Sequence, residues 1–83
     1  MNAVWMSNVF IVVNRDNADR NSLADITAAV TEIGSVVTVD EQSHWIEATV
    51  PSADLPTISA IEGVSYVRSA FNYLRGGAMP MAA

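Results

Sequence analysis

The residues Asn8–Asn14, "NVFIVVN", form an uninterrupted apolar and β-branched run of about the length of one β-strand. Successive side chains of a strand point to opposite faces of a sheet, so consecutive apolar residues such as those between Asn8 and Asn14 predict a strand covered on both faces. Such a strand belongs in the centre of a sheet. The chain must therefore fold around this segment as one of several paired strands.

A helix is predicted after this strand. Ser22 suits the N-cap, and Asp25 follows it three residues later, as in a capping box. Gly34 marks the end, where a residue with positive φ is commonly needed. The apolar residues recur at helical spacing and predict one buried face: Leu23, Ile26, Val30 and Ile33.

The rest of the chain repeats the pattern of strands flanking a helix. In the segment His44–Val50, apolar Ile46, Ala48 and Val50 alternate with residues expected to face outward. Asp54 is the predicted N-cap of the second helix, with Pro56 in its first turn and Gly63 as its stop. The predicted elements are strands at Ser35–Asp40, at His44–Val50 ending before Pro51, and at Val64–Ser69, with a helix at Asp54–Glu62.

The order strand, helix, strand, repeated twice, predicts an α+β fold of the ferredoxin-like split βαβ class (βαββαβ). In that fold two helices cover one face of a four-stranded antiparallel sheet, and the first and third strands are central. Residues 1–76 are expected to form this single domain, and residues 77–83 a flexible C-terminal tail.

The other sheet face would have no helix over it. Trp45 and Glu47 point to this face from a central strand, and Tyr66 and Arg68 are their counterparts on the last strand. An exposed apolar face on a small domain typically marks a protein interface, so these four residues are the predicted interface. The alternative is that the N-terminal "MNAVWM" or the C-terminal tail folds back over the face.

Composition excludes several classes of function. The chain has 83 residues, 51% apolar and 16% charged, with nine acids, four arginines, no lysine and a net charge of −5. Scattered arginines and a negative charge argue against nucleic acid as a partner. The N-terminal apolar run is too short for a membrane span and lacks the basic start of a signal peptide, so a cytoplasmic location is the default expectation. The absence of cysteine excludes disulfides and thiolate metal sites.

No group of residues predicts catalysis, a metal or a cofactor, so the chain is expected not to be an enzyme. His44 is the single histidine, and it is best explained as a solvated turn residue, since the acids near it alternate along a strand and would not converge. The loop "NRDNADRN" precedes the first helix, where Arg15 and Arg20 are candidates for binding an anion. It contains no glycine, which weakens that hypothesis.

The segment "SVVTVDEQSHWIEATVPSADLPTISAIEGVSYVRS" resembles the subtilisin propeptide and peptidase-inhibitor family. In that family an apolar residue and proline lead into a helix with spaced leucines, followed by Gly, Val, two residues and Val. The resemblance covers roughly residues 9 to 69. The matching positions are Val50, Pro51, Leu55, Ile58, Ile61, Gly63, Val64 and Val67.

This resemblance implies a function. Family members pack their open sheet face on helices of a subtilisin-type protease and lay the C-terminal segment into its cleft, with Tyr73 here entering an outer apolar pocket. The chain would then be a free-standing inhibitor or a propeptide-like chaperone. After the last valine the family typically has acidic residues that cap helices of the protease, and this chain has Arg68, Ser69 and Ala70 there instead. The cleft-binding residues implied are Phe71, Tyr73, Leu74, Arg75 and Gly76.

Two alternatives remain open. The segment "VVNRDNADRNSLADITAAVTEIGSVV" is similar to the start of ACT domains, which would imply a homodimer that binds a small ligand at the helix N-terminus. That family places a glycine where this chain has Asn21 or Ser22, and an Asn where it has Val36. The other alternative is an assembly module that buries its open face in a homo-oligomer.

Overall fold

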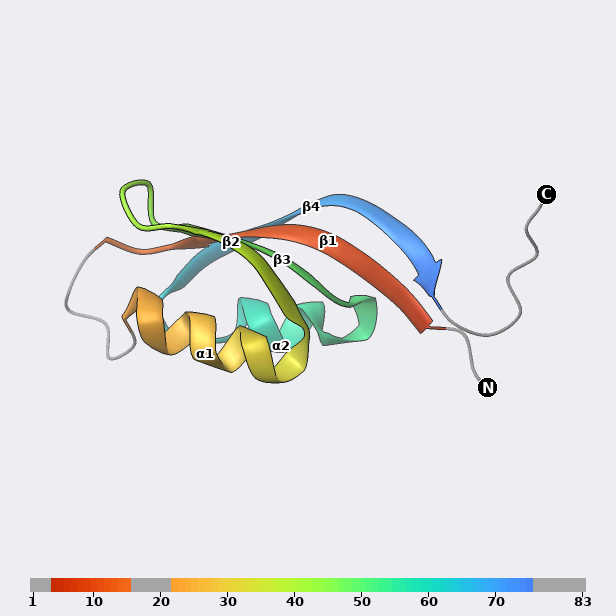
Figure 1. The fold of residues 1–83 in the computed structure, drawn as a ribbon. Coiled ribbons are helices and arrows are strands. Elements are labelled where there is room, and N and C mark those ends of the chain that lie inside the picture. Colours follow the sequence, from red (N-terminus) through yellow and green to blue (C-terminus); the bar gives the residue numbers. More distant parts are fainter. Residues whose placement is uncertain (1–3, 16–21, 76–83) are drawn as a thin grey trace.

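The structure is a computed structural model that describes residues 4–15 and 22–75. Along the chain, strands and helices follow one another in the order that the apolar patterns predicted (Figure 1). The elements are β1 (Val4–Val13), α1 (Leu23–Ile33), β2 (Ser35–Asp40), β3 (Trp45–Pro51), a 3₁₀ turn (Ser52–Asp54), α2 (Leu55–Ser59) and β4 (Val64–Arg75).

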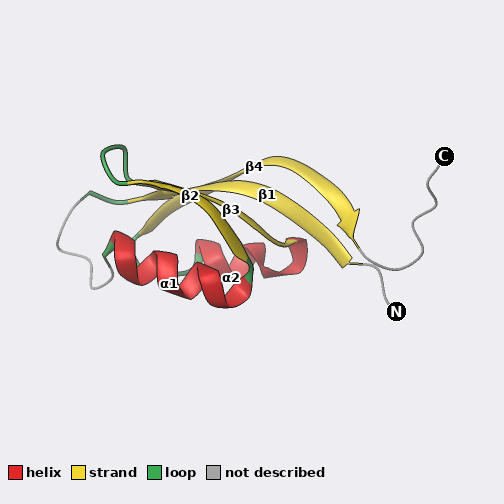
Figure 2. Cartoon of the chain, in the orientation of Figure 1, coloured by secondary structure: helices red, strands yellow, loops and turns green. Residues whose placement is uncertain are grey.

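The four strands form one antiparallel sheet in the order β2-β3-β1-β4. β1 and β3 are therefore central, and β2 and β4 are the edges. Both helices lie against the same face of the sheet, and the opposite face has no helix over it (Figure 2). The predicted α+β chain with a four-stranded antiparallel sheet and two helices is confirmed. We call the helix-free side the open face.

The core lies between the sheet and the helices. Ile46, Ala48 and Val50 are fully buried, whereas Trp45 and Glu47 are half-buried, so the alternation predicted for β3 is confirmed. Burying each aliphatic side chain contributes roughly 1.5–3 kcal/mol before the entropy of ordering the chain is subtracted. The other buried members of the core are Val9, Ile11 and Val13 of β1, Ile26 and Val30 of α1, and Ile58 of α2.

Both ends of α1 lie where the sequence placed them, but the reason given for Gly34 was wrong. Ser22 and Asp25 form the predicted capping box. Gly34 has φ −154°, not a positive φ. A Cβ there would collide with the backbone oxygen of Thr49 and lie 2.9 Å from Cγ1 of Val50. Glycine is needed because the chain passes directly against β3.

The second helix is shorter than the predicted Asp54–Glu62. It begins as a 3₁₀ turn and ends at Ser59, because the amide of Ala60 is shared between Pro56 and Thr57 and that of Ile61 bonds Ile58 in a three-residue turn. Asp54 makes no side-chain cap. Pro56 does lie in the first turn, and Gly63 has the positive φ (101°) expected at a stop.

β1 and β4 are both longer than predicted. β1 starts at Val4 instead of Asn8, and β4 continues past Ser69 to Arg75. The two added segments pair with each other, from Val4 opposite Arg75 to Ser7 opposite Asn72. Residues 70–75 were expected to extend freely or to fold over the open face, and they instead prolong the sheet. Gly76 and residues 77–83 lie outside the described residues.

Candidate functional site

The four predicted interface residues lie together on the open face. Glu47 of β3 pairs with Phe10 of β1, which pairs with Arg68 of β4. In the next row Trp45 pairs with Val12, and Val12 with Tyr66. Because paired residues of antiparallel strands share a face, these side chains form a continuous surface across three strands.

Aromatic rings form the centre of this surface. Phe10 and Trp45 pack edge to face, with ring centroids 5.4 Å apart and an interplanar angle of 79°. Beside them Tyr66 is 54% exposed. The rings border a hollow of about 640 Å³, which the sequence did not reveal, lined by Phe10, Val12, Trp45, Tyr66, Arg68, Ser69 and Ala70. Phe10 and Val12 had a signal in the sequence, since β1 is apolar at positions facing both sides.

A second aromatic pair lies on what we call the β4 extension, residues 71–75. A register shift between Asn8 and Val9 leaves Ala70 as an extra residue in β4. After this bulge Phe71 and Tyr73 share the open side, with ring centroids 6.3 Å apart and exposed fractions of 58% and 38%. We name Phe10, Trp45, Tyr66, Phe71 and Tyr73 together the aromatic band.

The remaining predicted cleft-binding residues are placed differently. Leu74 is half-buried and pairs with Trp5, which is 58% exposed. Arg75 is the last residue of β4 and pairs with Val4. The predicted cleft-binding residues within 71–75 thus lie in one strand. That strand is paired to β1 along one edge, whereas the prediction had this segment extending away from the domain or folding over the open face.

A polar cluster under the sheet fixes the β4 extension, and sequence reasoning missed it. Ser7 is fully buried, and its Oγ donates to Oδ1 of Asn72 at 2.7 Å and lies 2.6 Å from Oγ of Ser52. Oγ of Ser69 donates to the same Asn72 oxygen at 3.2 Å. These hydrogen bonds satisfy the buried hydroxyl of Ser7 and link β1 to β4 and to the 3₁₀ turn.

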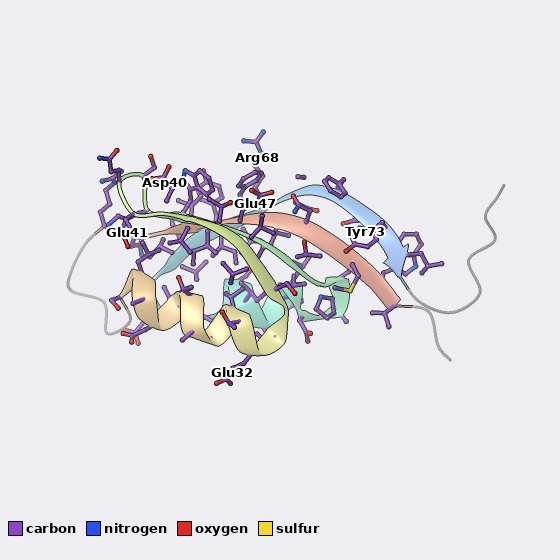
Figure 3. All side chains as sticks on the ribbon, viewed as in Figure 1. Glu32, Asp40, Glu41, Glu47, Arg68 and Tyr73 are labelled. Carbon is purple, nitrogen blue, oxygen red and sulfur yellow. The ribbon has the colours of Figure 1, made fainter. Side chains whose placement is uncertain are left out.

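Charges on the open face are separated by sign. Arg68 belongs to β4, whereas Glu47 belongs to β3 and Asp40 to β2. All three lie on the helix-free side of the sheet (Figure 3). Glu47 accepts a long hydrogen bond of 3.5 Å from Asn8. Within residues 4–15 and 22–75, Arg68 has no ion-pair partner. The cation is therefore available to a carboxylate from outside the chain.

His44 lies in the turn between β2 and β3. It adopts φ 58°, its backbone oxygen accepts from the amide of Val13 at 2.8 Å, and its Nδ1 is buried without a hydrogen-bond partner. It is half-buried instead of solvated as predicted. No three His, Asp or Glu side chains in the described part of the chain lie close enough together to hold a metal ion.

The start of α1 is occupied by residues of the chain itself. The carboxylate of Asp25 accepts from the amide and hydroxyl of Ser22, at 3.0 and 3.1 Å. The backbone hydrogen bond from Ser22, followed by the side-chain bond, lowers the pKa of Asp25. Arg15 donates to the backbone oxygen of Gln42 at 2.7 Å, and Arg20 lies outside the described residues. An anion at this helix terminus would meet a negative carboxylate.

Comparison with known proteins adds no relative. The chain matches no family model, no curated protein and no solved structure. Among the described residues, neither helix is long and apolar enough to cross a membrane.

Proposed function

We propose that this chain is a non-enzymatic protein-binding domain and that the open face is its binding surface. The observation that carries the proposal is the aromatic band, whose Tyr66 and Phe71 are 54% and 58% exposed on a sheet face without a helix. Aromatic residues and arginine are the types enriched where proteins dock on one another. The hollow beside Trp45 would receive a side chain of the partner.

We further propose that the fold is the ferredoxin-like split βαβ. The strand order β2-β3-β1-β4, with α1 between β1 and β2 and α2 between β3 and β4, supports this assignment. The helices on one side and the central positions of β1 and β3 agree with it.

The partner proposed is a subtilisin-type serine protease, on the strength of the resemblance of residues 9–69 to propeptides and inhibitors of that class. β4 is an edge strand, so its outer side offers main-chain groups that a protease cleft can pair with as an added strand. Tyr73 would fill an outer apolar pocket. The missing acids at Arg68, Ser69 and Ala70 would reduce affinity without removing the face or the strand.

Inhibition of a subtilisin tests this proposal. The purified protein is expected to slow peptide hydrolysis, and two variants are expected to lose the effect: Tyr66→Glu, which places a charge in the aromatic band, and a chain truncated after Ala70, which lacks the β4 extension. Glu32→Arg on the outer side of α1 is the control and is expected to inhibit like the wild type (Figure 3). Circular dichroism checks that each variant is folded.

The outcomes separate the parts of the proposal. No inhibition of several subtilisins contradicts the protease as partner. Inhibition that survives Tyr66→Glu contradicts the open face as the contact, and inhibition that survives truncation after Ala70 contradicts the role of the β4 extension.

A further inference from the structure

We propose that a second copy of this chain covers the open face in the free protein, in a two-fold symmetric dimer packed sheet to sheet. The inference rests on the proposed function, because it assigns a partner and a form of regulation to the same surface. The distribution of charge around the aromatic band favours this arrangement.

The charges of the open face are self-complementary. Glu47 and Arg68 stand on opposite sides of Phe10, each one strand away from it. Two strand spacings separate their strands by about 10 Å, and within the described residues no ion pair joins them. Each copy therefore presents one cationic side and one anionic side, with aromatic rings between them.

A two-fold axis parallel to the strands brings opposite charges together. Such an axis places β4 of one copy over β2 of the other, and β1 over β3, with the sheets about 10 Å apart. Arg68 of each copy then faces the carboxylates of Glu47 and Asp40 on the other copy. The contact is isologous, so the same ion pair forms twice and the assembly closes as a dimer.

The aromatic band occupies the middle of this contact. Trp45 of one copy lies over Val12 of the other, and the exposed ring of Tyr66 gains a cover that the helices cannot provide. The two hollows of about 640 Å³ would be filled by the facing rings. Burial of aromatic rings supplies the attraction, and the charge pairs set the orientation.

This dimer regulates the proposed binding surface. A protein that docks on the open face competes with the second copy, so the free protein keeps its aromatic band out of water until a partner displaces the copy.

Solution mass, measured by sedimentation over a range of concentrations, tests the inference with two charge reversals. Arg68→Glu creates a face with acids only, and Glu47→Arg gives a face whose positions 47 and 68 both carry arginine. Each variant alone is expected to dimerise at least about tenfold more weakly than the wild type, because like charges then meet twice. An equal mixture of the two is expected to form a heterodimer, since every 47–68 contact then joins opposite charges.

Glu32→Arg is the matched control, because it makes the same charge change on the outer side of α1 and should dimerise like the wild type. The inference is overturned if the wild type keeps its monomer mass of 8.9 kDa at every concentration up to about 1 mM, if either charge reversal alone dimerises as the wild type does, or if the mixture stays monomeric. A monomeric wild type that inhibits a subtilisin contradicts the dimer alone. A dimeric wild type without inhibition contradicts the protease proposal alone.

Discussion

At the scale of single residues, Ser22 and Asp25 decide where α1 begins. Oγ of Ser22 accepts from the amide of Asp25 at 3.2 Å, and the Asp25 carboxylate accepts in return from the Ser22 amide at 3.0 Å. Two amides of the first turn are thereby satisfied, and a negative charge lies at the positive end of the helix dipole. The same hydrogen bonds lower the pKa of Asp25 below 3.8.

The lowered pKa predicts a dependence of stability on pH. Asp25 binds its proton more weakly in the folded chain than in the unfolded one, so its contribution is complete above pH 3.8 and is lost as the pH falls through the folded value. Asp25→Asn should flatten the decline of thermal stability in this acidic range, measured by circular dichroism. Glu32→Gln, on an exposed part of the same helix, is the control. If thermal stability falls with pH equally steeply in Asp25→Asn and in the wild type, the capping box does not contribute as described.

The two glycines at the helix ends show what the sequence predicts about single residues. Gly63 was expected to stop the second helix, and its φ is positive, at 101°. Gly34 was expected to have the same conformation, but its φ is −154° and its lack of a side chain serves contact with Thr49 and Val50. The local pattern located the end of α1 at Gly34, whereas α2 ends at Ser59, before Gly63. Glycine is required at position 34 because β3 packs against it, and the residues next to Gly34 in the sequence do not reveal that contact.

At the scale of elements, the β4 extension was the largest departure from prediction. Val67 and Ser69 pair with Ile11 and Val9 of the helix-facing side, and the next residue with that orientation is Asn72, three positions later. The bulge at Ala70 interrupts the two-residue period by which strands are recognised. Moreover, an asparagine at a helix-facing position argues against a strand until the buried Ser7 is known to lie opposite it. The uninterrupted period of β3, by contrast, was enough to predict its two faces.

The polar cluster predicts how the extension responds to mutation. Asn72→Ala removes the acceptor for the buried hydroxyl of Ser7 and is expected to lower the free energy of unfolding by about 1 kcal/mol. Amides of residues 71–75 should then exchange with solvent faster, because this segment is held by β1 on one side only. Ser65→Ala, at an exposed position of the same strand, should change stability by less than about 0.5 kcal/mol. Equal stability and exchange in the two variants would show that the cluster does not hold the extension.

At the scale of the whole molecule, the two faces of the sheet differ in the side chains that they carry. The helix-facing side holds the aliphatic core, whereas the open face carries the aromatic band and separated charges. The apolar run of β1 predicted this division. Its residues Val9, Ile11 and Val13 supply the core, so the apolar side chains between them, Phe10 and Val12, must lie on the other face. The β4 extension that completes the surface and the hollow beside Trp45 depend on register, and the sequence did not show them.

Binding of protein to the open face is tested by the mass in solution of the wild type and of Tyr66→Glu. Each is sedimented alone and with an inactivated subtilisin. We expect the wild type to exceed its monomer mass of 8.9 kDa in at least one of the two samples, as a dimer or as a complex, and Tyr66→Glu to stay at 8.9 kDa in both while remaining folded. A wild type at 8.9 kDa in both samples, or a Tyr66→Glu variant that associates as the wild type does, would show that the open face is not a protein-binding surface.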